Sequence, residues 1–132
     1  MITIKRDVLN QIIVHAKGDL PNEACGYLAG EDGVVTFAYH LTNIDHSPEH
    51  FYLDPAEQFK TVKDARSKGL QILANYHSHP VTPSRPSQED IRLAFDPDIS
   101  YVIISLAETE PVAKSFRIVN GIAANEELVI TN

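Results

Sequence analysis

The chain has 132 residues, 43% of them hydrophobic and 22% charged, which suits one folded domain with a buried core. The formal net charge of −7 argues against nucleic acid as the main partner, because phosphate groups bind to basic surfaces. No apolar run is long enough to span a membrane, and the first residues carry charges where a signal peptide needs an apolar stretch. A single cysteine excludes an internal disulfide. We therefore expect a single domain over residues 1–132, located in the cytoplasm.

The first expected elements are a helix and a hairpin. Apolar side chains recur at helical spacing over residues 6–17 and predict an amphipathic helix. The apolar segments 24–30 and 33–41 are typical of strands, and the sequence Glu-Asp-Gly at 31–33 between them predicts a hairpin turn.

A second helix is predicted over residues 54–69. Asp54 is a suitable N-cap, and Pro55 stands at the first helical position. Gly69 is expected to form the C-cap, since glycine adopts the left-handed conformation that often ends a helix.

The rest of the chain is richer in strands. We expect a third, short helix that begins at Ser87, and strands over residues 70–79, 99–107, 112–119 and 126–131. Helices interleaved with strands predict an α/β fold, in which a single mixed β-sheet is flanked by helices. The order of the strands in the sheet does not follow from these patterns.

Residues 75–90, "NYHSHPVTPSRPSQED", combine several groups that bind metals. Side chains two apart on a strand share a face, so His77 and His79 point the same way. Three prolines stiffen the loop 80–86, and this loop can return the chain so that Asp90 faces the two histidines. Two imidazoles and one carboxylate are the ligand set of a catalytic zinc site with one open position.

Simpler interpretations exist for the same residues. Ser87 and Asp90 also fit a capping box, in which a serine caps a helix and an acid three residues later reaches back. Cys25 could act as a thiol nucleophile, but its apolar surroundings favour a small buried residue on a strand. For the other histidines we expect ordinary surface or core positions: His15, His40, His46 and His50.

The segment "HSHPVTPSRPSQED" resembles the signature of the JAMM (MPN+) metalloprotease domain, His-x-His-x7-Ser-x2-Asp. Upstream, "PNEACGYLAG" is similar to the Glu-x-Cys-Gly segment that carries the catalytic glutamate of this family. The resemblance extends from Glu23 to the strands after Asp90. One departure is Ala74, where members of the family often have glycine.

This resemblance implies a role for each matching residue. His77, His79 and Asp90 would bind one zinc ion per chain. Glu23 would take a proton from the attacking water and deliver one to the leaving amine, and Ser87 would help to hold the oxyanion. The family fold is a curved mixed sheet flanked by helices, with layers like those of cytidine deaminases.

The resemblance also implies a function: a zinc-dependent peptidase or isopeptidase. It would cut the bond after the Gly-Gly-type tail of a ubiquitin-like, sulfur-carrier protein. We expect that tail to lie along a sheet edge near the zinc, where main-chain hydrogen bonds provide affinity. Two alternatives remain open from the sequence, a non-catalytic protein-binding scaffold and a zinc hydrolase of a small amide. We expect no nucleic-acid or membrane partner, and the sequence does not determine the oligomeric state.

Overall fold

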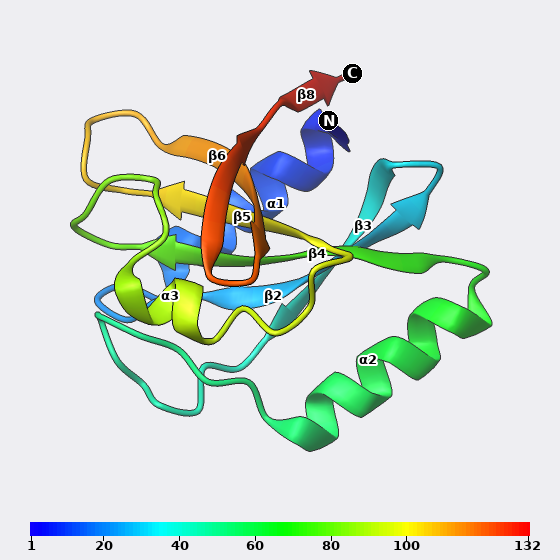
Figure 1. Ribbon diagram of the computed structural model, residues 1–132, viewed down its shortest axis with the longest axis horizontal. Helices are drawn as coiled ribbons and strands as arrows, with labels where there is room; N and C mark the ends of the chain where they lie inside the picture. The colour runs from blue at the N-terminus through cyan, green and yellow to red at the C-terminus, as the bar shows by residue number, and fades with distance from the viewer.

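The computed structural model describes residues 1–132 as three helices and eight strands (Figure 1). The helices are α1 (Arg6–Gly18), α2 (Pro55–Ser67) and α3 (Gln88–Arg92). The strands are β1 (Ile2–Lys5), β2 (Cys25–Glu31), β3 (Val34–Leu41), β4 (Gln71–His79), β5 (Ser100–Ser105), β6 (Val112–Val119), β7 (Ile122–Glu126) and β8 (Leu128–Thr131).

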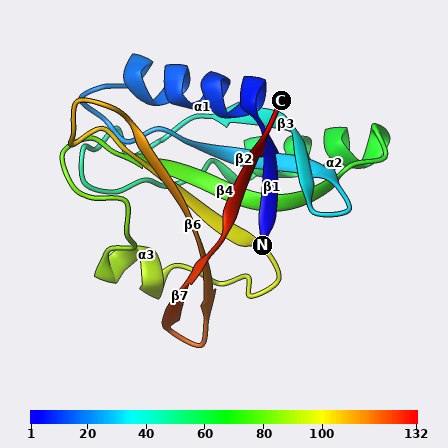
Figure 2. The same ribbon diagram turned by 90° about the horizontal axis from the view of Figure 1, so that it is seen from above.

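All eight strands form one sheet, in the order β7-β6-β5-β4-β2-β3-β1-β8. The sheet is mixed, because β4 pairs with β5 in parallel while β2 pairs with β4 in the antiparallel direction. The sheet is also curved and has helices on both faces, with α1 and α3 on opposite sides (Figure 2). The predicted α/β class with a single mixed sheet is confirmed.

The residues predicted to form the hairpin turn and to end the second helix lie at or next to the expected positions. Asp32 and Gly33 both have positive φ, at 53° and 76°, and they close the β2–β3 hairpin. The Asp54 carboxylate accepts the Ala56 N–H at 2.9 Å and caps α2. Gly69 adopts the left-handed conformation with φ of 72°, although the C-cap itself is Lys68, one residue earlier.

Two strands were missed by sequence reasoning. β1 has only four residues, and its pairing partners β3 and β8 are distant in the sequence. The second missed strand is β7, which ends at Glu126, and the strand expected over 126–131 corresponds to β8, which begins at Leu128. The third helix is short, as expected; it runs from Gln88 to Arg92 and has Ser87 as its N-cap.

The main core lies between the sheet and α1. Val8, Leu9, Ile12 and Ala16 are the buried residues of this helix, and they pack against the strands. A smaller apolar cluster on the opposite face joins β5 to β6 through Tyr101, Ile103, Phe116 and Ile118. The space beside this smaller cluster is where the candidate site lies. None of the three helices has the length and hydropathy needed to span a lipid bilayer.

Candidate metal centre and adjoining cleft

The centre of the site is a pair of histidines at the end of β4. His77 and His79 alternate with Ser78, so both imidazoles project from the same face of the sheet, as predicted. Their Nε2 atoms lie 3.1 Å apart. Both side chains are buried, and β4 lies between β5 and β2 inside the sheet.

Asp90, in the first turn of α3, completes the cluster. Its Oδ2 lies 3.1 Å from Nε2 of His77 and 3.1 Å from Nε2 of His79. Burial alone would raise the pKa of Asp90. The hydrogen bonds from His77 and His79 outweigh burial and, with the backbone N–H of Ser87, hold that pKa well below its usual range.

The loop between β4 and α3 also orients His79. The Nδ1 atom of His79 lies 2.9 Å from the carbonyl oxygen of Pro83. A carbonyl only accepts hydrogen bonds, so Nδ1 carries a proton, and Nε2 is the nitrogen of His79 that would bind a metal ion. This orientation by the backbone is typical of histidines that bind metals.

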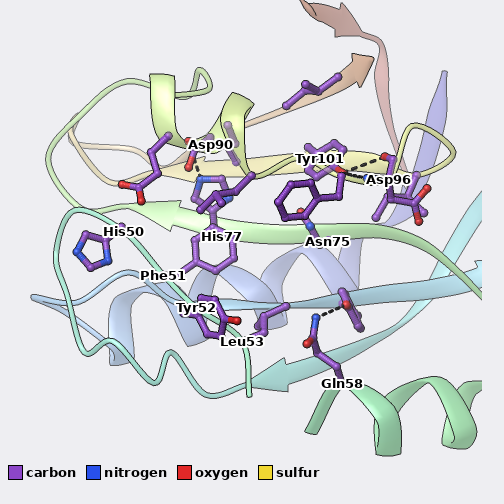
Figure 3. Close-up of a pocket in the computed structure, with 17 residues that line it drawn as sticks. His50, Phe51, Tyr52, Leu53, Gln58, Asn75, His77, Asp90, Asp96 and Tyr101 are labelled. Atoms are coloured by element: carbon purple, nitrogen blue, oxygen red, sulfur yellow. Dashed lines mark hydrogen bonds and ion pairs between the residues drawn. The ribbon is translucent and has the colours of Figure 1, made fainter. Parts of the chain in front are cut away.

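His77 is held by packing instead. The ring of Phe51 stacks on its imidazole, with ring centroids 4.7 Å apart and an angle of 28° between the planes. Nδ1 of His77 is buried and has no hydrogen-bond partner. Figure 3 shows Phe51 and His77 facing each other at the cluster.

The three side chains fit a zinc ion. Bonds of about 2.0–2.1 Å in a tetrahedral site place neighbouring ligand atoms about 3.3 Å apart. The three distances within the cluster are each 3.1 Å, and the ligand atoms are two imidazole nitrogens and one carboxylate oxygen. His77, His79 and Asp90 form the one group of three or more potential metal ligands in the chain.

Glu23 lies just before β2 and is almost fully buried, with 3% of its surface exposed. Burial raises the pKa of Glu23 to about 8; the charge of His79 lowers it and that of Asp90 raises it. Its Oε1 atom is buried without a partner. The backbone around it is fixed, since Glu23 N–H donates to the Ser47 carbonyl at 2.8 Å and the Asn43 amide donates to the Glu23 carbonyl at 3.0 Å.

Ser87 is the N-cap of α3. Its Oγ accepts the N–H of Asp90 at 3.0 Å, and the N–H of Ser87 donates to Oδ2 of Asp90 at 2.9 Å. The capping box is therefore present, and it involves the same carboxylate oxygen that faces the two histidines. The hydroxyl of Ser87 uses an acceptor lone pair in the cap, which leaves its own proton free to donate.

The remaining candidates lie outside the cluster. Cys25 is fully buried, and burial raises the pKa of its thiol to about 12, so the thiolate needed for nucleophilic attack is disfavoured. His15 and His40 stack on each other 4.5 Å apart, and Nδ1 of His15 lies 2.8 Å from the Tyr76 hydroxyl. His50 pairs with Asp45 at 2.9 Å.

A cleft of about 360 Å³ opens beside the cluster, and most of the residues that line it are apolar. It runs along β4 from His77 to Asn75, between the segment 50–53 and the part of the chain that includes α3 (Figure 3). The expectation of a sheet edge near the cluster is wrong. β4 lies inside the sheet, whose edges are β7 and β8, so the cleft is the open surface at this position.

Sequence reasoning missed three features that support the site: Phe51, the Pro83 carbonyl and Asn75. Nothing in the segment 50–53 predicts the stacking on His77. Asn75, by contrast, had a signal, because it stands two residues before His77 and the same alternation along a strand places it on the same face.

The sequence profile of prokaryotic homologues of the JAB domain matches residues 5–119. The chain is 36% identical over 129 residues to the CysO-cysteine peptidase of Mycobacterium tuberculosis, covering 96% of this chain and 88% of that protein.

Two solved structures share the fold. A solution structure of a Desulfitobacterium hafniense protein superposes with a TM-score of 0.92 at 51% identity, over 99% of this chain and 93% of that one. The crystal structure of a JAB1/MPN domain protein from Archaeoglobus fulgidus gives a TM-score of 0.67 at 24% identity, over 98% and 97% of the two chains. The chain therefore belongs to the prokaryotic JAB-domain family, as its resemblance to JAMM proteins implied, and it is a hydrolase of the JAMM type.

Proposed function

We propose that this protein is a zinc-dependent peptidase that cuts the bond after the glycine tail of a ubiquitin-like, sulfur-carrier protein, with His77, His79 and Asp90 as the zinc ligands. The observation that carries the proposal is the convergence of three buried ligand atoms at 3.1 Å from one another. In this proposal residues 1–132 act as one domain, which agrees with the pairing of β1 with β8 near the two ends of the chain.

Zinc bound by these side chains would supply a water acidified to a pKa of about 7 and a polarised substrate carbonyl. Glu23 accepts a proton from the attacking water as its oxygen adds to the carbonyl carbon. The hydroxyl of Ser87 donates a hydrogen bond to the oxygen that becomes negative. Glu23 then delivers the proton to the leaving nitrogen as the carbon–nitrogen bond breaks.

The buried position of Glu23 suits this double role. Burial moves the pKa of Glu23 from its ordinary value of 4.5 toward neutral pH, where a group that first accepts and then returns a proton acts most efficiently. Its Oε1 atom has no hydrogen bond from the protein, so no partner within the fold competes for it.

The substrate assignment has two supports. The relative from Mycobacterium tuberculosis is named a CysO-cysteine peptidase. In the chain itself, α3 follows β4 after a short loop, and the strands from β5 to β8 are joined by short connections. From β4 to β8, no long inserted segment is therefore available to grip a second protein, and in this proposal recognition falls mainly on the tail.

The test is cleavage of a ubiquitin-like protein joined through a Gly-Gly tail to cysteine or lysine, compared with the same conjugate ending in Ala-Ala. The expected result is cleavage of the first and little cleavage of the second, since a glycine tail lets its backbone approach the site closely. Equal cleavage of both conjugates, or cleavage of unrelated peptides alone, would contradict the substrate assignment.

A further inference from the structure

One polar group in the cleft has no partner. Asn75 lies on β4 two residues before His77, projects from the same face and lines the cleft (Figure 3). Its Oδ1 atom is buried and accepts no hydrogen bond. A buried carbonyl oxygen without a donor costs free energy, so a ligand that supplies an N–H at this position would be favoured.

The neighbouring polar groups already have partners. The Tyr27 hydroxyl accepts from the Gln58 amide at 2.9 Å. The Tyr101 hydroxyl donates to the Asp96 carbonyl at 2.9 Å and accepts the Asp96 N–H at 3.2 Å. Asn75 Oδ1 is therefore the buried polar atom in this part of the cleft that has no partner.

The surroundings of Asn75 select the kind of ligand. The cleft beside it is lined by apolar side chains that include Leu53, Ile103 and Ile118. Carboxylates of Glu89 and Asp96 also line the cleft and would repel a negatively charged ligand. The Asn75 side chain presents a carbonyl acceptor and an NH2 donor group, which match a neutral peptide group better than a free carboxylate.

The spacing identifies which peptide group would bind. Two residues of a strand span about 6.6 Å, and this separates Asn75 from His77 along β4. An extended peptide tail also advances by about 6.6 Å for every two residues. If its last carbonyl is at the metal cluster, the peptide N–H of the first of its two glycines lies about one such span away.

On the basis of the function proposed above, we propose that Asn75 is a substrate-binding residue that accepts the N–H of the first glycine of the tail. The side chain of the residue before this glycine then occupies the apolar part of the cleft. The enzyme is thereby selective for tails in which an apolar residue precedes the two glycines, and the amine side of the bond lies on the other side of the cluster.

The kinetic test combines a variant of the enzyme with a variant of the substrate. Asn75→Leu keeps the size of the side chain and removes both polar atoms. In a matched substrate, glycolic acid replaces the first glycine, which exchanges the N–H for an oxygen. Wild type should lose about ten-fold in kcat/KM on the ester substrate, and Asn75→Leu should lose about as much on the normal substrate, mainly through KM.

The decisive measurement is the Asn75→Leu variant with the ester substrate, because this variant should cleave the ester and the normal substrate with the same kcat/KM. Asn125→Leu, on the exposed strand β7 outside the cleft, is the control and should behave as wild type. Replacing the apolar residue before the glycines by aspartate should also lower kcat/KM about ten-fold. A variant Asn75→Leu that equals wild type, or that still distinguishes the ester, would overturn the proposal.

Binding of the uncleaved product separates this inference from the proposed function. A free peptide that ends in the two glycines is titrated calorimetrically into zinc-loaded wild type and Asn75→Leu, with about ten-fold weaker binding expected for the variant. If wild type cleaves no conjugate but shows this difference, the proposed reaction fails and the assignment of Asn75 stands. Equal binding to both proteins overturns the assignment, whatever the activity.

Discussion

Ser87 and Asp90 cap each other across the first turn of α3. The Ser87 hydroxyl accepts the Asp90 N–H at 3.0 Å, and Asp90 Oδ2 accepts the Ser87 N–H at 2.9 Å. The same oxygen lies 3.1 Å from Nε2 of His77. A capping box thus fixes the carboxylate that faces the histidines, and the structural and the metal-binding interpretations of this pair are compatible.

This relationship predicts two separable effects of Ser87→Ala. Loss of the cap should lower the free energy of unfolding by about 1 kcal/mol. Loss of the hydroxyl that is proposed to hold the oxyanion should lower kcat about 10²-fold. Ser87→Thr, which keeps both the cap and a hydroxyl, should retain stability and activity. Denaturant titration and steady-state kinetics on the three proteins measure both effects, and full activity of Ser87→Ala would contradict the oxyanion role.

Glu23→Gln should leave the zinc content and the fold unchanged and remove turnover, because a general base typically contributes about 10²–10⁴-fold. Cys25→Ser serves as the comparison, since its buried thiol has a pKa raised by burial to about 12 and should not take part in the chemistry. Activity assays with zinc analysis on both variants measure this. An inactive Cys25→Ser that is folded, alongside an active Glu23→Gln, would favour a thiol mechanism.

Glu23 should also make the zinc-free protein sensitive to pH. Burial raises its pKa in the folded state to about 8, above the ordinary value of 4.5. The folded state then binds the proton more tightly than the unfolded state. Stability from this group is fully present below the unfolded pKa and is lost as pH rises toward the folded pKa.

The difference between wild type and Glu23→Gln isolates this contribution. The free energy of unfolding of zinc-free wild type should fall relative to that of the variant between about pH 4.5 and about pH 8. Denaturant titrations at several pH values within this window measure the difference. A constant difference across the window would show that the pKa of Glu23 is not raised.

Gly26→Ala should destabilise the fold severely. A Cβ at this position on β2 would collide with the Tyr39 carbonyl oxygen and come within 2.6 Å of the Tyr76 ring, which is fully buried. Overpacking of this kind typically costs about 1–3 kcal/mol, and contact with backbone leaves little room to relax. Gly18→Ala, with no atom within 4 Å of the added Cβ, is the matched control and should be nearly neutral by thermal denaturation.

Much of the site follows from local rules that the sequence displays. Alternation along a strand places His77 beside His79, and a stiff loop with a capping motif returns Asp90 to them. The family resemblance supplied Glu23, whose proximity to the cluster depends on the pairing of β2 with β4. Local patterns contain no information on such pairing between distant segments.

Other features depend on contacts that no short pattern encodes. β1 is stabilised by parallel pairing with β3 and β8, which are remote in the sequence. The β6–β7 hairpin is different, because a short pattern does predict it. Asn120 and Gly121 form its turn, with φ of 53° and 76°, and they stand between two β-branched residues. Phe51 could not have been predicted, because its position against His77 results from tertiary packing alone.

The central claim is that His77, His79 and Asp90 hold a zinc ion that the reaction requires. Elemental analysis of purified wild type and His77→Ala, at matched protein concentration, tests it most directly. We predict one zinc per wild-type chain and most of the zinc lost from the variant, because three protein ligands are the minimum for a catalytic site of this kind. Equal zinc in the two proteins, or none in an active wild type, would contradict the account.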